Sequence, residues 1–231
     1  MPVWTLANMK GGVAKTTSAL MLAQAAQQTG HRVLLVDLDL NAQLSRLLGH
    51  WPAEQAGAFA DTPEVIRLGE QLSLVPAPGA DFPLDGALAG RGLSDRLVAL
   101  ATAHDLCIID TPSGYMPFLR ELLRLSEVWI TPTPLTPVVR QASVHYLLRM
   151  ARLALAEHTR LTVRLLPVQF NAHLGSHRIG LEALRRFVGS WRVLPPVRQD
   201  AHLTGVLSDT AHRLTPARRD YLDVCRVLGV C

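Results

Sequence analysis

One short polar stretch constrains the fold of this 231-residue chain more than any other feature. It lies between an apolar run, Val3 to Ala7, and a helix-like segment, Ser18 to Gln28, so it falls at a strand-to-helix turn. The chain has two lysines against 21 arginines, and both lysines, Lys10 and Lys15, are in this stretch. A glycine-rich turn between a strand and a helix is the setting in which backbone N–H groups and the helix dipole hold a phosphate.

The residues of this stretch are Lys10, Gly11, Gly12, Val13, Ala14, Lys15, Thr16 and Thr17. In a phosphate-binding loop, Lys15 reaches the β- and γ-phosphates and the Thr16 hydroxyl binds Mg²⁺. Met9 and Ala14 stand where the general pattern GxxxxGK[ST] has glycines. If position 14 needs a positive φ, alanine costs roughly 1–2 kcal/mol there. The alternative interpretation is a glycine-rich turn with two solvated lysines.

A lysine five residues before the phosphate lysine, followed by two glycines, is the deviant form of this loop. The sequence here resembles the ParA/MinD family of partitioning and positioning ATPases, whose motif reads KGGxGK[ST]. The resemblance implies that residues 10–17 bind ATP or ADP with Mg²⁺. It also implies catalytic roles for both lysines: Lys15 is the ordinary phosphate lysine, and Lys10 crosses a dimer interface to the partner's nucleotide.

Two later apolar runs end in acidic residues, one at Asp37 and Asp39 and the other at Asp110. Continuous apolar runs are typical of strands buried on both faces of a parallel sheet, and ligands bind at the carboxyl ends of such strands. By the resemblance, Asp37 supports the Mg²⁺ shell, Asp110 holds Mg²⁺ and Asp39 orients the attacking water. The alternative is that Asp37 and Asp39 only cap a helix from Asn41 to Leu48.

The segments that would follow these acids depart from the family pattern. Leu40-Asn41 stands where Pro-Gln is usual, and Pro112-Ser113-Gly114 is a shortened second switch. Together with Ala14, these departures leave open a nucleotide-binding switch with little turnover.

Further strand-like runs, Val128 to Pro132 and Val163 to Asn171, flank a helical stretch from Val138 to Glu157. Strands alternating with helices predict an α/β fold, a mostly parallel twisted sheet flanked by helices. The segment Glu54 to Pro83 is expected to form loops around one short strand, Leu72 to Val75. Length and composition predict a single domain over residues 1–231, and the resemblance implies that it is an ATPase domain.

The loops after the last strands hold adenine in the family. By resemblance, Asn171 and the loop Pro195 to Asp200 are the candidate base contacts, with Pro196, Arg198 and Asp200 its chosen members. A polar residue after a strand is also a common turn former, so Asn171 has that second interpretation.

Positive charge is concentrated late in the chain. Residues 1–139 carry 9 basic and 13 acidic side chains, a balance of −4, whereas residues 140–231 carry 14 arginines and 6 acids, a balance of +8. A basic face can meet DNA phosphates without reading bases. The candidate DNA contacts are Arg178, Arg185, Arg186, Arg213, Arg218 and Arg219. The alternative is that these arginines form ordinary solvated helix faces.

The resemblance implies a homodimer in the ATP state, nonspecific DNA binding, and a ParB-like or other adaptor protein that defines the cargo. The expected location is cytoplasmic, because the chain begins directly with a strand and no signal peptide is expected. Nucleoid association is expected from the implied DNA binding. Three cysteines in no metal-ligand spacing agree with a reducing compartment. MinD-like members bind membrane through a C-terminal helix, but the stripe within Thr215 to Leu228 favours docking on the core instead.

Overall fold

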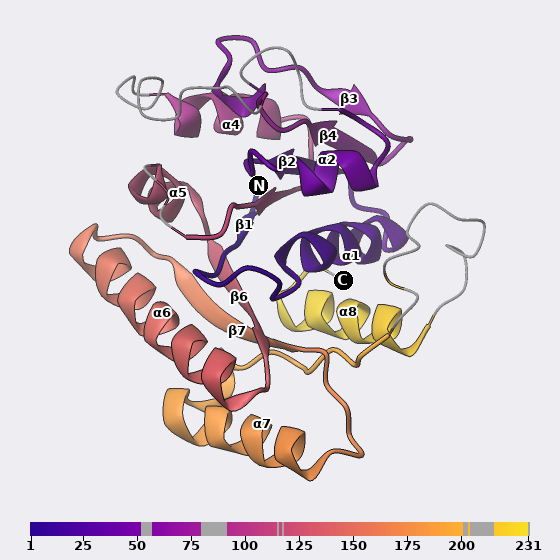
Figure 1. Cartoon of the computed structure of the whole chain (residues 1–231). Coiled ribbons are helices and arrows are strands. Elements are labelled where there is room, and N and C mark those ends of the chain that lie inside the picture. The colour runs from indigo at the N-terminus through magenta and orange to yellow at the C-terminus, as the bar shows by residue number, and fades with distance from the viewer. Residues whose placement is uncertain are drawn as a thin grey trace.

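A central sheet of seven strands organises the chain (Figure 1). The computed structural model describes residues 1–51, 57–79, 92–114, 116, 118–200, 203 and 215–230. The strand order is β3-β4-β2-β5-β1-β6-β7, and all neighbours are parallel except β3 and β4. The strands are β1 (Val3–Leu6), β2 (Val33–Asp37), β3 (Ile66–Arg67), β4 (Leu72–Val75), β5 (Leu106–Asp110), β6 (Val128–Pro134) and β7 (Thr162–Val168). The α/β fold with a mostly parallel sheet is therefore confirmed.

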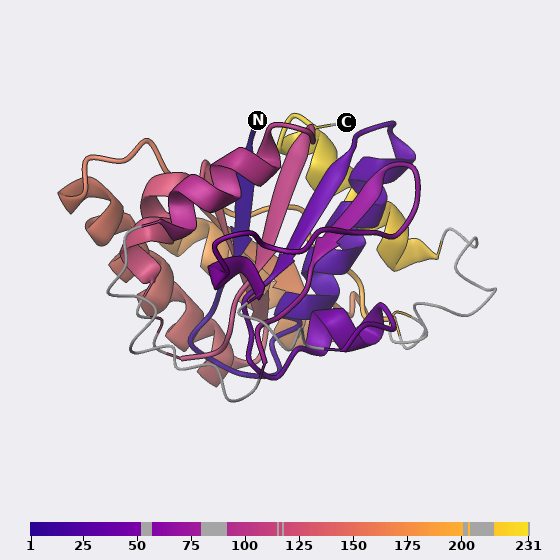
Figure 2. The same cartoon turned by 90° about the horizontal axis from the view of Figure 1, so that it is seen from above.

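Helices cover both faces of this sheet (Figure 2). On one face α1 and α8 pack together with α2, and on the other lie α4, α5, α6 and α7. The helices are α1 (Lys15–Gln28), α2 (Gln43–Leu47), α4 (Leu93–Ala101), α5 (Leu119–Leu125), α6 (Pro137–Ala156), α7 (Gly175–Val188) and α8 (Pro216–Val227), with short 3₁₀ turns η1 (Gly57–Phe59) and η2 (Ser190–Arg192). The strands β1, β2 and β5 are buried along their whole length, as their continuous apolar runs predict.

Some element ends differ from the sequence expectations, and backbone conformation explains two of them. The strand expected to reach Asn171 ends at Val168, because Gln169 has a φ of 55°. The helix expected from Asn41 begins at Gln43, since Ala42 has a φ of 51°. Neither conformation belongs to a strand or a right-handed helix.

The C-terminal helix α8 docks on the core, as its apolar stripe predicts. The Tyr221 hydroxyl lies 3.0 Å from the Ser18 hydroxyl on α1, and the Cys225 thiol donates to the Leu22 carbonyl at 3.7 Å. Tyr221, Val224 and Cys225 are buried. Within the described residues, no helix has the length and apolar character needed to cross a membrane.

Candidate functional site

The loop between β1 and α1 has the backbone of an anion-binding turn. Gly12 has a φ of 70° and Ala14 a φ of 64°. Ala14 thus adopts the left-handed conformation that glycine takes most easily, at a cost of about 1–2 kcal/mol. Helix α1 begins at the next residue, so its unpaired N–H groups and positive dipole end face this loop.

Lys15 is the one lysine that the fold buries, with 7% of its surface exposed. Its Nζ donates to the Ser113 hydroxyl at 2.7 Å and to the Lys10 carbonyl at 3.3 Å. Burial lowers the pKa of Lys15, and the charges of Asp110 and Asp39 oppose that shift. The ammonium is therefore held inside the site, close to two carboxylates, and not in solvent.

The sheet register brings Asp37 and Asp110 side by side. They are direct partners at the carboxyl ends of β2 and β5. The Asp37 carboxylate accepts from the Asp39 N–H at 3.0 Å, the Ser45 N–H at 2.9 Å and the Ser45 hydroxyl at 2.7 Å. Burial raises the pKa of Asp37 despite these bonds. Both of its oxygens serve to hold the following loop and α2 in place.

Asp110 differs from Asp37 because neither of its buried carboxylate oxygens has a hydrogen-bond partner of ordinary geometry. Burial, followed by the charge of Asp37, raises its pKa to about 8, and the nearby Thr16 hydroxyl and Lys15 charge offset part of that rise. A buried carboxyl without a donor is costly unless a cation or proton satisfies it.

The donor set here fits Mg²⁺ in its usual protein setting. Among the described residues, no three His, Cys, Asp or Glu side chains are grouped to hold a metal. Mg²⁺ rarely needs such a group, since it binds through one or two carboxylates, waters and phosphate oxygens. Asp110 and the Thr16 hydroxyl are the direct candidates, whereas Asp37 is placed to support them from its hydrogen-bonded position.

A polar cavity of about 440 Å³ lies over the phosphate loop. It brings the loop together with the segments that follow β2 and β5, and Asp39 lines it near Lys15. Asp39 Oδ1 accepts from the backbone and side-chain N–H groups of Asn41, both at 2.9 Å. The full lining is Gly11, Gly12, Ala14, Lys15, Thr16, Thr17, Asp39, Asn41, Gln43, Ser113 and Gln169. Of the remaining loop residues, Val13 is buried and Lys10 is half-buried.

A second cavity of about 270 Å³ adjoins the first and shares Ala14, Thr17 and Gln169 with it. Gln199 and Asp200 line it, together with Arg198 and Tyr221. A neighbouring space of this size, walled by Val168, Val197 and Leu203, suits a flat heterocycle attached to the phosphates. Sequence reasoning missed Gln169, although a polar residue directly after the apolar run of β7 was a usable signal.

Two predicted base contacts have other attachments. Asn171 forms a turn before α7: its Oδ1 accepts from the His173 N–H at 2.9 Å and its N–H donates to His177 Nδ1 at 3.1 Å. Arg198 forms a two-pronged ion pair with Asp220 on α8, at 2.7 and 2.9 Å. Asn171 and Pro196 are absent from the described linings of both cavities. Arg198 borders the second cavity while tying its loop to α8.

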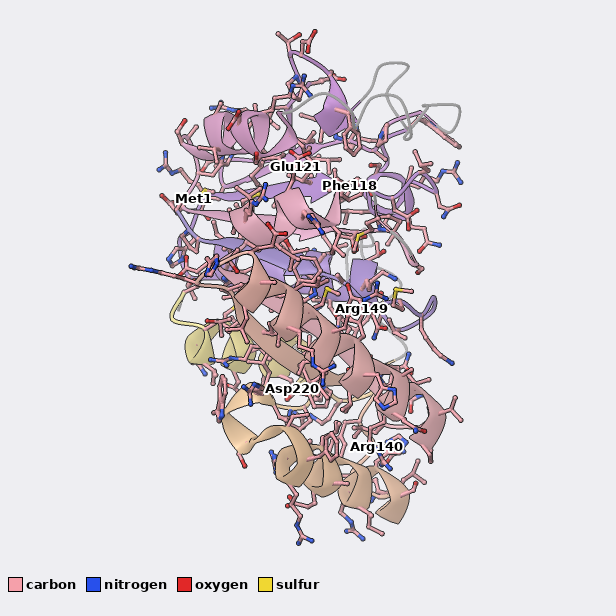
Figure 3. All side chains as sticks on the ribbon, turned by 90° about the vertical axis from the view of Figure 1, so that its left-hand side faces the viewer. Met1, Phe118, Glu121, Arg140, Arg149 and Asp220 are labelled. Carbon is pink, nitrogen blue, oxygen red and sulfur yellow. The ribbon has the colours of Figure 1, made fainter. Side chains whose placement is uncertain are left out.

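The predicted DNA-contact arginines lie in unlike surroundings. Arg178, Arg186 and Arg219 are exposed. Arg185 pairs with Glu182 at 3.1 Å, and Arg218 is buried with 9% exposure. Arg213 lies outside the described residues. Within the described residues, Arg178, Arg186 and Arg219 are therefore the candidates that remain exposed and outside any ion pair. Figure 3 labels two further arginines, both on α6: Arg149 is exposed, whereas Arg140 is half-buried with its guanidinium against Gly180 of α7.

Another hollow within the described residues, of about 1050 Å³, lies at the opposite, amino end of the strands. Its most prominent polar pair is Arg32 and Asp105, joined at 2.8 Å and both partly exposed. Since these two groups satisfy each other, this hollow lacks the unpaired buried charge that marks the carboxyl end.

Comparison with known proteins decides the family. The model of the CobQ/CobB/MinD/ParA nucleotide binding domain matches residues 4–212. The chain belongs to this family. It is 33% identical over 124 residues to the maintenance of carboxysome distribution protein A of Synechococcus elongatus, covering 47% of this chain and 48% of the relative. It is 32% identical over 137 residues to the chromosome-partitioning ATPase Soj of Thermus thermophilus, covering 55% and 52%. The chain thus matches about half the length of these relatives.

Solved structures show the same architecture over the whole chain. Apo McdA of Cyanothece superposes with a TM-score of 0.84 at 19% identity, covering 99% of this chain and 100% of that one. Cobyrinic acid a,c-diamide synthase of Mycobacterium smegmatis, with bound ADP and magnesium, has a TM-score of 0.81 at 24% identity, covering 99% and 94%. At these identities the likeness shows the fold alone, and the fold is that of this nucleotide-binding family.

Proposed function

We propose that the chain is a ParA-like ATPase that binds ATP with Mg²⁺, dimerises in that state, binds DNA nonspecifically and segregates or positions a cargo such as a plasmid or chromosome. One observation carries the proposal: the buried Lys15 ammonium and the Thr16 hydroxyl line one polar cavity, and the Asp110 carboxylate, which has no hydrogen-bond partner of ordinary geometry, lies close enough to interact with both. The phosphates of ATP would supply an anion for the Lys15 ammonium. The bound Mg²⁺ would supply a cation for the Asp110 carboxylate.

In this proposal the phosphate loop binds and orients the nucleotide. Backbone N–H groups of Gly11 to Thr16 surround the β-phosphate, and Lys15 reaches the β- and γ-phosphates. Thr16 and Asp110 hold Mg²⁺, which neutralises charge on the phosphate oxygens when bound. The base enters the second cavity beside Gln169 and Asp200.

Asp39 is the proposed water-orienting residue, because its carboxylate lines the same cavity as Lys15. One of its oxygens already accepts two hydrogen bonds from Asn41. Those bonds fix the carboxylate, so hydrolysis would be slow until a partner protein or DNA reshapes this loop. A switch that holds nucleotide with very little turnover is the second candidate, favoured by this attachment and by the strained Ala14.

Lys10 is the proposed link between two subunits. Its backbone is fixed, since its N–H donates to Asn8 Oδ1 at 3.1 Å and its carbonyl accepts from Lys15. Lys10 directly precedes Gly11, which lines the cavity, and its half-buried side chain is the proposed contact with an opposing subunit's nucleotide. The dimer would then present exposed arginines to DNA, in a nucleoid-associated state, and an adaptor of the ParB type would define the cargo.

Light scattering with a nonhydrolysable ATP analogue and Mg²⁺ tests this proposal. The wild-type chain should change from monomer to dimer, whereas Lys10→Ala should bind the analogue and remain monomeric. Arg226→Ala is a suitable control, because Arg226 is exposed and pairs with Asp223 on its own helix. A wild-type chain that binds the analogue but stays monomeric rules out the dimer switch. Analogue-dependent dimerisation of Lys10→Ala removes Lys10 from the interface.

A further inference from the structure

We propose that Ser113 is a positioning residue that makes the site discriminate ATP from ADP. The inference rests on the proposed nucleotide binding, but it assigns a role to a side chain that the loop, metal and water-orienting assignments leave unused. Ser113 lies in the segment after β5, three residues beyond Asp110.

The Ser113 hydroxyl occupies a place that a phosphate oxygen would take. It accepts a hydrogen bond from Lys15 Nζ at 2.7 Å, the shortest bond that this ammonium makes among those described. It also lies against the phosphate loop, since a Cβ added at Gly11 would be 3.6 Å from it. Without nucleotide, the hydroxyl is therefore a substitute ligand for the phosphate lysine.

In the proposed exchange, nucleotide binding breaks this contact. Lys15 in a phosphate loop reaches the β- and γ-phosphates, so either ADP or ATP draws Nζ away from Ser113. A hydrogen bond that involves a charged group contributes substantially to stability, and losing it opposes binding. When ADP binds, the Ser113 hydroxyl loses its bond to Lys15 and finds no phosphate oxygen to replace it.

In the proposed pose ATP differs, because its γ-phosphate would lie beyond the β-phosphate in the cavity that Ser113, Lys15 and Asp39 line together. A serine hydroxyl is both acceptor and donor. It accepts from Lys15 in the nucleotide-free protein and can donate to a γ-phosphate oxygen once Lys15 has moved. The other Lys15 partner, the Lys10 carbonyl, is an acceptor only and offers nothing to an anion. The same hydroxyl therefore opposes ADP binding and recovers its hydrogen bond with ATP.

The segment that carries Ser113 is suited to this exchange. Pro112 precedes it with a restricted φ, and Gly114 follows with a φ of 90°. Any residue with a side chain in place of Gly114 would strain the turn. Ser113 is exposed to the cavity, so its hydroxyl can rotate from Lys15 to a phosphate without disturbing the core.

Calorimetry of ADP and of a nonhydrolysable ATP analogue, each with Mg²⁺, tests the inference. In Ser113→Ala we expect tighter ADP binding and no gain for the ATP analogue. The affinity for the ATP analogue divided by the affinity for ADP should therefore fall about tenfold. Ser113→Thr retains the hydroxyl and should keep the wild-type ratio within about twofold. Ser190→Ala, at the exposed start of η2, is the matched control. Thermal melting of each variant checks that the fold is intact.

The outcomes separate this inference from the function on which it rests. If the wild type binds neither nucleotide, the proposed function fails and Ser113 loses its role with it. If the wild type binds both and Ser113→Ala changes both affinities by the same factor, the proposed function stands and the discrimination by Ser113 is wrong. A ratio that falls equally in Ser113→Thr also overturns it, because the hydroxyl would then not be the cause.

Discussion

Charged side chains are buried around the phosphate cavity and mostly exposed in the described part of the arginine-rich C-terminal region. Around the cavity, Lys15, Asp37, Asp39 and Asp110 are buried, and the charge of Asp110 interacts with those of the other three. The acids lie at the carboxyl ends of strands or just after them, and Lys15 is the first residue of α1, so the backbone fixes the position of each. Among the described arginines of residues 140–231 most are exposed, and two pair with an acid on their own helix, Arg185 with Glu182 and Arg226 with Asp223.

This difference has an energetic basis. A buried charge without a partner is costly, so the fold must supply one or leave the place to a ligand. An exposed arginine costs little wherever it lies, and an exposed ion pair contributes about 0–1 kcal/mol. The buried charges of the cavity therefore indicate the chemistry of its ligand, whereas the exposed arginines of residues 140–231, the arginine surface, are compatible with many partners or none.

Removal of Lys15 should give the largest effect. Lys15→Ala should reduce ATP affinity more than about a hundredfold, because a triphosphate would lose its main cationic contact beside Asp110. Calorimetry measures the loss. Lys10→Ala, which removes the chain's other lysine, should bind ATP nearly as well as the wild type. Unchanged affinity in Lys15→Ala would mean that the cavity does not bind phosphate through this lysine.

Asp39 should separate binding from turnover. Asp39→Ala is expected to slow hydrolysis at least about tenfold while ATP affinity stays within a few-fold, since the phosphate loop and Asp110 remain. Asp39→Asn retains an acceptor for Asn41 and should show the same loss, which separates the carboxylate's charge from its structural bonds. Asp95→Ala, an exposed acid on α4, is the control. Phosphate release measures turnover. Normal turnover would move the water-orienting role to Asp37.

Asp110 allows a test without nucleotide. Its pKa is raised to about 8 by burial, so from about pH 4 to 8 the folded chain retains a proton that the unfolded chain has lost. Stability should therefore fall as pH rises through this window and level off above it. Asp110→Asn should flatten that decline and be more stable than the wild type at pH 8, as urea denaturation can measure. It should also lose Mg²⁺-dependent nucleotide binding. An equal pH dependence in both chains would contradict the assigned cost of the Asp110 charge.

The same contrast explains what could be predicted from sequence. The apolar runs that end in Asp37 and Asp110 predicted two buried strands, and parallel pairing then required their carboxyl ends to meet. For Ala14 the sequence analysis set only a condition, that alanine is costly if the position needs a positive φ, and the structure meets that condition with a φ of 64°.

Predictions from single polar residues were weaker, because the local pattern around such a residue leaves its partner open. Arg198 pairs with Asp220 on α8, which is distant in sequence, whereas Asn171 forms a turn with the nearby His173 and His177, the second interpretation that its position after a strand allowed. The sequence placed Gln169 inside an expected strand. In the structure its backbone is left-handed, and the residue lines both cavities. Arg218 fits a basic helix face in sequence, yet α8 docks with that side chain buried.

The smallest effect is expected on the arginine surface, where Arg178 and Arg186 are the exposed candidates on α7. If they contact DNA phosphates, replacing both with Gln should weaken ATP-dependent DNA binding equally for all sequences. It should also flatten the salt dependence by about two units, one per lost contact. Arg185 makes a poorer test because Glu182 already pairs with it, and Arg218 is excluded because its burial couples replacement to folding.

Arg226→Gln is the matched control for that measurement, since it removes the same charge from an exposed helix position where Asp223 neutralises the guanidinium at 2.7 Å. Fluorescence anisotropy over a salt series, on two unrelated duplexes, compares the three chains. A shallower slope in the α7 double variant alone would give the arginine surface a defined partner. Equal slopes in all three chains, with DNA binding retained, would show that α7 is an ordinary solvated face and that the DNA contact lies on another part of the dimer.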